Sequence, residues 1–337
     1  MINVLLVDDS AVIRAILKQI LGSDSRFCIV GEASNGKDAF TKNKMLCPDV
    51  IIMDVNMPVM NGIEATRLIM NDSPTTIVMF TTEDTVKNGF EGITAGAVEL
   101  IEKPNLSVSS AEFYNDFKEK IYQLGSRNKK NIPVERPERV ESTSDKKINL
   151  IMIGTSTGGP LAVKTVLSDI KNNLKVPVLV TQHIDASFAN HYVPWLKETT
   201  GMEIKYASDG EPCVGGVVYV APPDFHMTVK GDGESGLYYI SLNKDAQVHF
   251  LRPAVDPMFF SGAKVAGANS VAILLTGMGN DGAEGCVELK RNGAYTICES
   301  EETCSVYGMP KSAIELNGAT EVLPLYEIGK RVSELIG

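Results

Sequence analysis

A serine stands in a glycine-rich turn near the middle of the chain. Ser156 lies between Gly154 and Gly158, after a short apolar run and before residues 161–170, which have helical character. At such a turn the backbone N–H groups of the helix N-terminus point outward and favour developing negative charge, and the glycines permit tight bending. The position suits a nucleophile whose reaction passes through an oxyanion. A phosphate-binding or purely structural turn is the alternative.

A serine nucleophile needs a general base and a carboxylate that orients the base. His183 is the best-placed base, because it ends a predicted strand and so belongs to the same sheet rim as Ser156. Asp281 lies in a glycine-rich loop after a further apolar run, where capping a helix is its alternative role. The other histidines, on a helix surface or in irregular segments, are His191, His226 and His249. The weaker candidates for the acid are Asp185, Asp209, Asp224 and Asp256.

Comparison with known sequence motifs excludes some of the folds in which the Ser156 turn could occur. Residues 154–158 also read as Gly-x-Ser-x-Gly, the nucleophile elbow of α/β-hydrolases. That fold places its histidine near the chain end, whereas the last histidine here is His249. Neither a dinucleotide fingerprint nor a Walker A lysine follows the serine. The predicted triad is therefore convergent, with the backbone amides near Thr157 and Met278 as candidate oxyanion donors.

Acidic residues and a lysine follow the strands predicted in the first part of the chain. Asp8 and Asp9 follow the first strand, Asp54 the third, Thr81 the fourth and Lys103 the fifth. The carboxyl ends of parallel strands share one crevice, where three carboxylates repel one another unless a divalent cation neutralises them. Oxygen-only ligands point to Mg²⁺. Asp54 could then accept a phosphoryl group, with Lys103 and Thr81 binding its oxygens.

Strand-like and helix-like segments alternate through both halves of the chain. Five alternations over residues 1–124 predict a flavodoxin-like, doubly wound parallel sheet. Residues 125–147 are charged and proline-punctuated, which is typical of an exposed tether. The alternation resumes over residues 148–337 and predicts a second doubly wound, Rossmann-like α/β domain with an antiparallel hairpin around residues 230–242. The predicted strands are 4–7, 27–30, 50–53, 76–80, 98–101, 149–153, 177–182, 217–220, 271–275 and 295–298.

The composition excludes several classes of protein. A net charge of −10 argues against a general nucleic-acid binder and against binding to an anionic membrane surface. No apolar run approaches the roughly 20 residues of a membrane span, and the acidic start is unlike a signal peptide. The 6 cysteines are scattered without a Cys-x-x-Cys pair, which favours free thiols in a reducing compartment. We therefore expect a cytoplasmic protein that does not insert into a membrane.

The first domain resembles the receiver domain of two-component response regulators. The residues that carry the resemblance are Val7 to Ser10, Met53 to Pro58, Thr81 and Lys103-Pro104. The resemblance implies that Asp54 is the phosphoacceptor, that a histidine kinase is the donor, and that Mg²⁺ binds to Asp8, Asp9, Asp54 and the backbone carbonyl of Asn56. One position departs from the family pattern, since Leu100 stands where many members carry an aromatic switch residue.

The second domain resembles the catalytic domain of the chemotaxis-specific protein-glutamate methylesterases, the CheB family. The matching stretches are 154–160, 182–183, 218–222, 226–227, 252–256, 276–283 and 305–311. The resemblance implies hydrolysis of glutamate γ-methyl esters on methyl-accepting chemotaxis receptors, with release of methanol, and deamidation of receptor glutamines. It also implies a metal-free esterase site and control of that site through Asp54.

Two other functions fit the same residues. The esterase could act on a receptor outside chemotaxis, or the second domain could be a regulated receptor-binding module without catalysis. An intact set of Ser156, His183 and Asp281 argues against the binding module.

Overall fold

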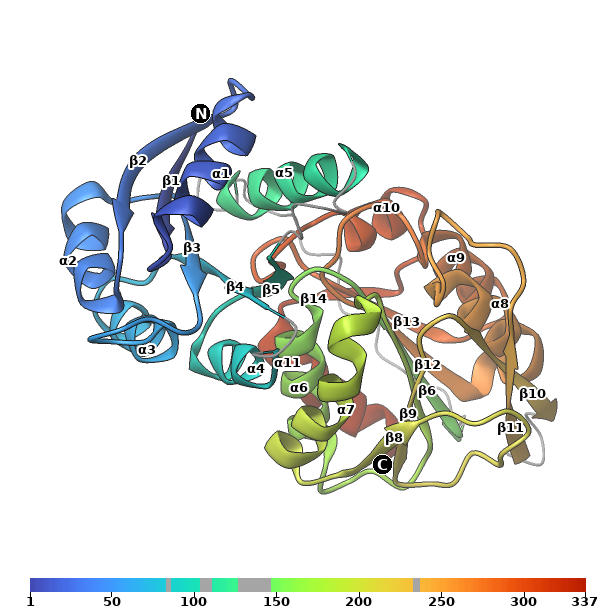
Figure 1. The fold of residues 1–337 in the computed structure, drawn as a ribbon. Helices are drawn as coiled ribbons and strands as arrows, with labels where there is room; N and C mark the ends of the chain where they lie inside the picture. Colours follow the sequence, from blue (N-terminus) through green and yellow to red (C-terminus); the bar gives the residue numbers. More distant parts are fainter. Residues whose placement is uncertain (83–85, 104–110, 127–146, 233–236) are drawn as a thin grey trace. The chain divides into compact units, whose positions relative to one another are not determined.

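The structure is a computed structural model that describes residues 1–82, 86–103, 111–126, 147–232 and 237–337. Contacts divide the chain into two compact units, Met1–Ile132 and Pro133–Gly337 (Figure 1). The predicted tether, residues 125–147, lies almost entirely outside the described residues. Its first two residues belong to a helix that ends at Ser126. The predicted domain boundaries remain predictions.

The first unit contains a five-stranded parallel sheet in the order β2-β1-β3-β4-β5. Its central strand has the sequence Val-Ile-Ile-Met-Asp and is buried throughout, as expected for a strand covered by helices on both faces. This order is the flavodoxin-like topology that the sequence predicts. The strands are β1 (Ile2–Val7), β2 (Phe27–Ala33), β3 (Val50–Asp54), β4 (Thr76–Thr81) and β5 (Glu99–Glu102).

Five described helices flank this sheet. Helices α1 and α5 contact each other, whereas α2, α3 and α4 contact one another in sequence. Three helices begin at a side-chain cap, since Ser10, Asn35 and Asn61 each accept a hydrogen bond from the backbone N–H three residues later. The helices are α1 (Ala11–Gly22), α2 (Gly36–Leu46), α3 (Gly62–Asp72), α4 (Val86–Ala95) and α5 (Ala111–Ser126).

The second unit contains a seven-stranded parallel sheet in the order β14-β13-β12-β6-β7-β9-β8. The order reverses between β12 and β6, where crossovers leave in opposite directions and ligands bind in doubly wound folds. The strands are β6 (Leu150–Thr155), β7 (Val178–Gln182), β8 (Glu203–Tyr206), β9 (Val217–Val220), β12 (Ser270–Leu274), β13 (Tyr295–Glu299) and β14 (Glu321–Leu323).

Helices form two groups around this sheet. Helix α6 contacts α7 and α11, and helix α9 contacts α8 and α10. A separate antiparallel hairpin of β10 and β11 packs on α8, which confirms the predicted antiparallel excursion. The helices and hairpin strands are α6 (Gly159–Ile170), α7 (Ala186–Thr200), α8 (Val255–Val265), α9 (Ala283–Arg291), α10 (Met309–Glu315), α11 (Leu325–Ile336), β10 (His226–Asp232) and β11 (Leu237–Asn243), with a short 3-10 turn at Gly267–Asn269.

The two edge strands of the second sheet, β8 and β14, are absent from the strands that the sequence predicts. They span 4 and 3 residues. Such short segments carry too little periodicity to distinguish a strand from a loop, and they become strands only through pairing with β9 and β13.

Candidate functional site

The register of the second sheet brings the serine and histidine together. Thr155 at the end of β6 pairs with Gln182 at the end of β7, so that Ser156 and His183 follow side by side. The loop after β12 packs against them, because a Cβ atom added at Gly277 would lie 2.8 Å from the Cβ of Ser156. The Ser156 N–H also donates to the Thr276 carbonyl over 3.0 Å. Only a residue without a side chain allows this close approach.

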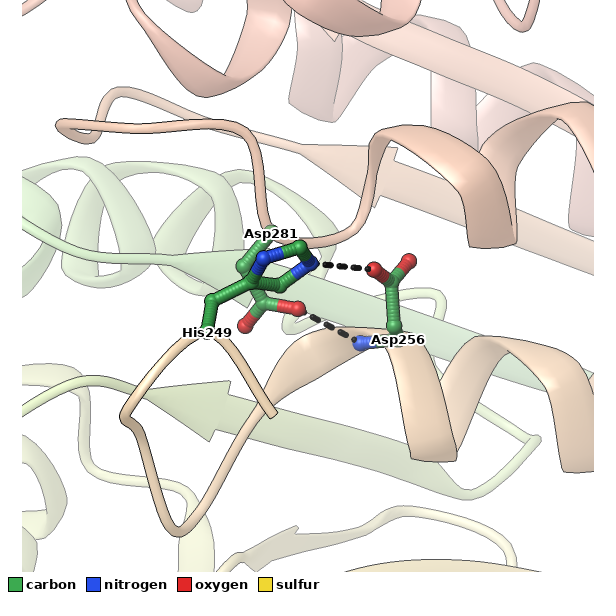
Figure 2. A group of neighbouring side chains, drawn as sticks. All are labelled: His249, Asp256 and Asp281. Atoms are coloured by element: carbon green, nitrogen blue, oxygen red, sulfur yellow. Dashed lines mark hydrogen bonds and ion pairs between the residues drawn. The ribbon is translucent and has the colours of Figure 1, made fainter. Parts of the chain in front are cut away.

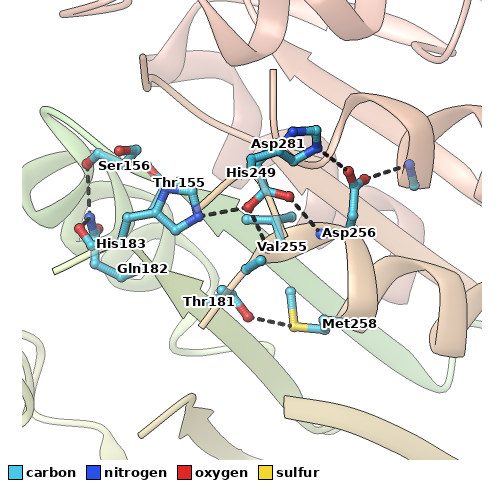
Figure 3. Close-up of polar contacts among 12 residues, drawn as sticks. Thr155, Ser156, Thr181, Gln182, His183, His249, Val255, Asp256, Met258 and Asp281 are labelled. Carbon is cyan, nitrogen blue, oxygen red and sulfur yellow. Dashed lines mark hydrogen bonds and ion pairs between the residues drawn. The ribbon is translucent and has the colours of Figure 1, made fainter. Parts of the chain in front are cut away.

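His183 and Asp281 form a tight pair (Figure 3). The Nε2 atom of His183 lies 2.7 Å from Oδ2 of Asp281. Both side chains are shielded from solvent, with 7% and 1% of their surfaces exposed. Because Nε2 is engaged, Nδ1 is the ring nitrogen left to face a reacting group. The pairing of the predicted base with the predicted acid is therefore present.

Asp281 accepts two further hydrogen bonds from the start of α8. The backbone N–H groups of Val255 and Asp256 donate to its two carboxylate oxygens over 2.6 and 3.0 Å. Burial by itself would raise the pKa of Asp281, but the hydrogen bond and charge of His183 and these two N–H groups lower it overall. Asp281 therefore stays ionised. It does not cap its own helix, since α9 follows Gly282 without a side-chain cap; it caps α8 instead.

The Ser156 hydroxyl makes no hydrogen bond to His183 in the described part of the chain. Such catalytic hydrogen bonds are often loose until substrate binds. The two residues are nevertheless held together by Gln182, to which the sequence gives no role beyond its place in the family-matching stretch 182–183. Its buried Nε2 group donates to the carbonyl of Ser156 over 2.8 Å and to the carbonyl of His183 over 2.9 Å. Apart from that resemblance, nothing in the sequence distinguishes this glutamine from an ordinary strand residue.

The two candidate oxyanion donors belong to the two segments next to the serine. Thr157 follows Ser156 in the turn before α6, and Met278 follows Gly277 in the loop that packs on Ser156. Neither backbone N–H donates a hydrogen bond within the residues that the structure describes. Both groups are therefore available to a ligand, and their role remains a prediction.

A second histidine and a second aspartate extend this polar cluster (Figure 2). The Nε2 atom of His249 lies 3.3 Å from Oδ2 of Asp256. His226, expected in an irregular segment, instead begins β10 and is buried, with its Nδ1 accepting the Ala254 N–H over 3.2 Å. Asp256, a weaker candidate in the sequence, touches Asp281 through its backbone. Asp256 and Asp281 are 25 positions apart in the sequence, so their contact could not be predicted from it.

The acidic cluster of the first unit lies where the strand order reverses between β1 and β3. Val7 pairs with Met53, so Asp8 and Asp54 follow side by side. Lys103 places its ammonium group 2.7 Å from Oδ2 of Asp8 and 2.8 Å from Oδ1 of Asp54. Burial raises the pKa of Asp54 to about 6, with a further rise from Asp8 and Asp9 that Lys103 opposes. This carboxylate is therefore mostly ionised at pH 7 and takes up a proton as the pH falls through about 6.

The donor set of this cluster fits a divalent cation. One carboxylate oxygen from each of Asp8, Asp9 and Asp54 lies within 4.8 Å of the others. Oδ2 of Asp8 is buried and, despite its ion pair with Lys103, has no well-directed hydrogen bond. A hard cation that prefers oxygen ligands would satisfy it. The predicted fourth ligand, the carbonyl of Asn56, belongs to the exposed loop after β3.

The two predicted switch residues lie at the ends of neighbouring strands, Thr81 as the last residue of β4 and Lys103 directly after β5. Thr81 is buried at the end of β4, and the backbone N–H of Lys103 donates to its carbonyl over 2.6 Å. The Thr81 hydroxyl donates to the carbonyl of Thr82 over 3.3 Å. Leu100, at the position of the family's aromatic residue, is 5% exposed and packs against Gly89 of α4.

Comparisons with known proteins match both units. The model of the CheB methylesterase family matches residues 151–332, and that of the response regulator receiver domain matches residues 4–109. A protein-glutamate methylesterase/protein-glutamine glutaminase of Halalkalibacterium halodurans is 39% identical over 96% of this chain and 95% of its own. The chain belongs to the CheB methylesterase family. A relative of the same name from Thermotoga maritima is 37% identical over 99% of this chain and 98% of its own.

A solved structure supports the family assignment of the second unit. The crystal structure of the Thermotoga maritima CheB methylesterase catalytic domain is 37% identical and covers 56% of this chain and 99% of its own, with a TM-score of 0.53. This CheB-family chain is thus an ester hydrolase with a receiver domain. Among its described residues, no helix is both long and apolar enough to cross a bilayer.

Proposed function

We propose that this chain is a phosphorylation-activated serine esterase that hydrolyses glutamate γ-methyl esters on methyl-accepting chemotaxis receptors and deamidates receptor glutamines. The observation that carries the proposal is the 2.7 Å contact between His183 and Asp281 beside the glycine-flanked Ser156, in a chain that shares both domains with the CheB family. Ionised Asp281 holds the imidazole by Nε2 and leaves Nδ1 to accept the hydroxyl proton.

The reaction follows from these positions. His183 takes the proton of Ser156 while the serine oxygen attacks the ester carbonyl, and the oxyanion accepts hydrogen bonds from the backbone N–H groups of Thr157 and Met278. His183 then returns the proton to the departing methoxide, which releases methanol and leaves an acyl-serine. Water, deprotonated by His183, hydrolyses the acyl-serine to glutamate and free Ser156. For a glutamine substrate the leaving group is ammonia.

The receiver unit supplies the regulation. Asp8, Asp9, Asp54 and the carbonyl of Asn56 would hold Mg²⁺, which when bound neutralises the carboxylates and the phosphoryl oxygens. The Asp54 carboxylate attacks the phosphoryl group of a phosphohistidine on the chemotaxis histidine kinase and forms an acyl phosphate. Lys103 pairs with the phosphoryl oxygens, and the Thr81 hydroxyl turns from the Thr82 carbonyl to bind them. We expect these partners in the cytoplasm, without nucleic acid or membrane insertion.

Methanol release from methylated receptor membranes tests the proposal. Wild type and Ser156→Ala are compared with and without Mg²⁺ and a small phosphodonor. We expect release that requires Ser156 and that rises when the phosphodonor is added. An absence of release from wild type under every condition would point to a different substrate or to the receptor-binding module.

A truncated chain tests the regulation separately. Deletion of residues 1–147 should raise methanol release above the level of unphosphorylated wild type, if the unphosphorylated receiver unit inhibits the esterase. An unchanged or lower rate would contradict inhibition by the receiver.

A further inference from the structure

A second imidazole–carboxylate pair lies directly behind Asp281. His249 contacts Oδ2 of Asp256 over 3.3 Å, and the Asp256 N–H donates to Oδ1 of Asp281 over 3.0 Å. One ligand-type atom from each of these three side chains lies within 4.8 Å of the others. Figure 2 shows the His249 ring and the Asp256 carboxylate facing each other beside Asp281. Two acids thus stand between two imidazoles, in the order His183, Asp281, Asp256 and His249.

The second pair is buried at the acid and open at the histidine. The Asp256 side chain is 2% exposed, whereas 35% of the His249 side chain is exposed. Burial raises the pKa of Asp256 to about 6, and repulsion from Asp281 adds to the rise, while the N–H groups of Gly285 and Gly282 and the His249 hydrogen bond oppose it. Cys286 also lies near Asp256, and its hydrogen bond to Cys298 together with burial raises the pKa of its thiol well above the usual value, so it is neutral. The charge of Asp256 therefore depends on its partners.

His249, Asp256 and Asp281 are close enough together to bind a metal ion. The carboxylate oxygens of both aspartates, however, already accept hydrogen bonds. Oδ1 of Asp256 accepts the Gly285 N–H over 2.8 Å, and Oδ2 contacts His249. Both oxygens of Asp281 accept backbone N–H groups from α8, and Oδ2 also contacts His183. Backbone N–H groups at the starts of α8 and α9 thus stabilise the negative charge of the two carboxylates, as a bound cation otherwise would.

We propose that Asp256, kept ionised by His249, is a positioning residue that places a second negative charge behind Asp281 and thereby stabilises the imidazolium form of His183 during ester hydrolysis. The proposal rests on the proposed function of Ser156 and His183. In a buried site a nearby negative charge favours a protonated imidazole, because the interaction is weakly screened. Asp281 supplies the direct contact, and Asp256 supplies the additional field.

The pH dependence of ester hydrolysis by the full chain tests this role. Asp256→Asn removes the charge but keeps an oxygen that can accept the Gly285 N–H. We expect the midpoint of the acid limb of the pH–rate profile to move to lower pH by about half a unit, while the rate on the plateau stays within several-fold of wild type. An unmoved midpoint would overturn the proposal. A merely structural role would lower the plateau without moving the midpoint.

Two variants of the exposed histidine supply a matched comparison that leaves the buried acid in place. His249→Ala removes the donor to Asp256, so the midpoint should move in the same direction as in Asp256→Asn, by a smaller amount. His249→Gln retains an N–H donor and should stay near the wild-type midpoint. If Asp256→Asn does not fold, this pair decides the question. Equal midpoints for wild type and both variants would contradict the role of His249.

A titration that does not require turnover separates this inference from the proposed function. The His183 ring signal can be followed by NMR as a function of pH in the full chain, with His183→Gln to assign it. If methyl-ester hydrolysis fails or is unaffected by Ser156→Ala, the proposed function is wrong. The shift of the His183 titration between wild type and Asp256→Asn still supports the inference if it is present and overturns it if it is absent.

Discussion

Both units bury two neighbouring carboxylates at the place where the strand order of a parallel sheet reverses. In the receiver unit they are Asp8 and Asp54, opposite the single ammonium group of Lys103. In the esterase unit they are Asp281 and Asp256, surrounded by backbone N–H groups and two imidazoles. The same topology therefore places acids in the same way but neutralises them by different means.

The difference explains what each site can do. The receiver site gathers the carboxylates of Asp8, Asp9 and Asp54 around the ammonium group of Lys103, so its charge balance depends on what binds, which suits a site that is switched. The esterase site satisfies its acids with groups fixed in the fold, which suits a site that must hold one imidazole in one orientation through every turnover. Exchangeable and fixed neutralisation should therefore respond differently to substitution, to pH and to removal of the metal.

The largest effect should follow from removing the fixed acid. Asp281→Asn replaces an oxygen that accepts hydrogen bonds with an NH₂ group facing N–H donors and His183. We expect methyl-ester hydrolysis to fall by about 10³–10⁴-fold and the free energy of unfolding of the esterase unit to fall by about 1–3 kcal/mol. Initial rates and urea unfolding measure these effects. Asp185→Asn, at the exposed start of α7, is the control, and an equal loss there would contradict the assignment.

The next largest effect should follow from replacing Gln182, whose side chain bonds to the backbone of both Ser156 and His183. Gln182→Leu keeps the approximate volume but leaves the carbonyls of Ser156 and His183 without their shared donor. The misplacement should lower kcat by about 10–100-fold, and the buried carbonyls should lower stability by about 1–3 kcal/mol. Rate and stability are measured for the exposed Gln247→Leu in parallel. Wild-type kcat in Gln182→Leu would show that the sheet alone positions the two residues.

The exchangeable site should make stability depend on pH and on Mg²⁺. Because the pKa of Asp54 is raised to about 6 in the folded chain, its contribution to stability is fully present below its ordinary value and is lost as the pH rises through about 6. The loss without metal is on the order of 1–3 kcal/mol. Mg²⁺ favours the ionised carboxylate, so it should raise the melting temperature of the receiver unit more at pH 7.5 than at pH 5.5.

Asp54→Asn should remove most of this pH dependence, since the amide does not ionise. Thermal unfolding with and without Mg²⁺ measures the effect, and the exposed Asp72→Asn on α3 is the matched control. A Mg²⁺ effect of equal size at both pH values would show that the cation does not compete with a proton on Asp54.

The smallest expected effect is on the basal rate after metal removal. EDTA should abolish the acceleration by a small phosphodonor and leave Ser156-dependent methanol release from the unphosphorylated chain unchanged, because the acids of the esterase unit are neutralised by protein groups. Methanol release with and without EDTA, followed by restoration with excess Mg²⁺, measures both. A basal rate that falls with EDTA and returns with Mg²⁺ would show that the esterase unit also depends on a metal ion, and would contradict the difference proposed between the two sites.

The sequence predicts much of the fold and of both candidate sites, for a physical reason. Parallel strands buried on both faces are continuous apolar runs, and the polar residues that end them share one rim, so strand ends such as Asp8, Asp54 and His183 mark the sites directly. Lys103 and Asp281 were found in the same way. The edge strands β8 and β14 were not predicted, because they are too short to show a hydrophobic pattern. They form strands only by pairing with β9 and β13.

The local sequence determined which residues carry reactive groups and which end of the sheet they occupy, since both follow from side-chain chemistry and the period of the chain. Tertiary structure alone decided that Asp281 caps α8 instead of its own helix, that Gln182 ties Ser156 to His183, and that His249 and Asp256 stand behind Asp281. The contacts of Asp281 with α8 and of Gln182 with Ser156 join residues 25 and 26 positions apart. Hydrogen bonds of that range depend on how helices and loops pack on the sheet, and packing is a property of the whole unit rather than of any segment.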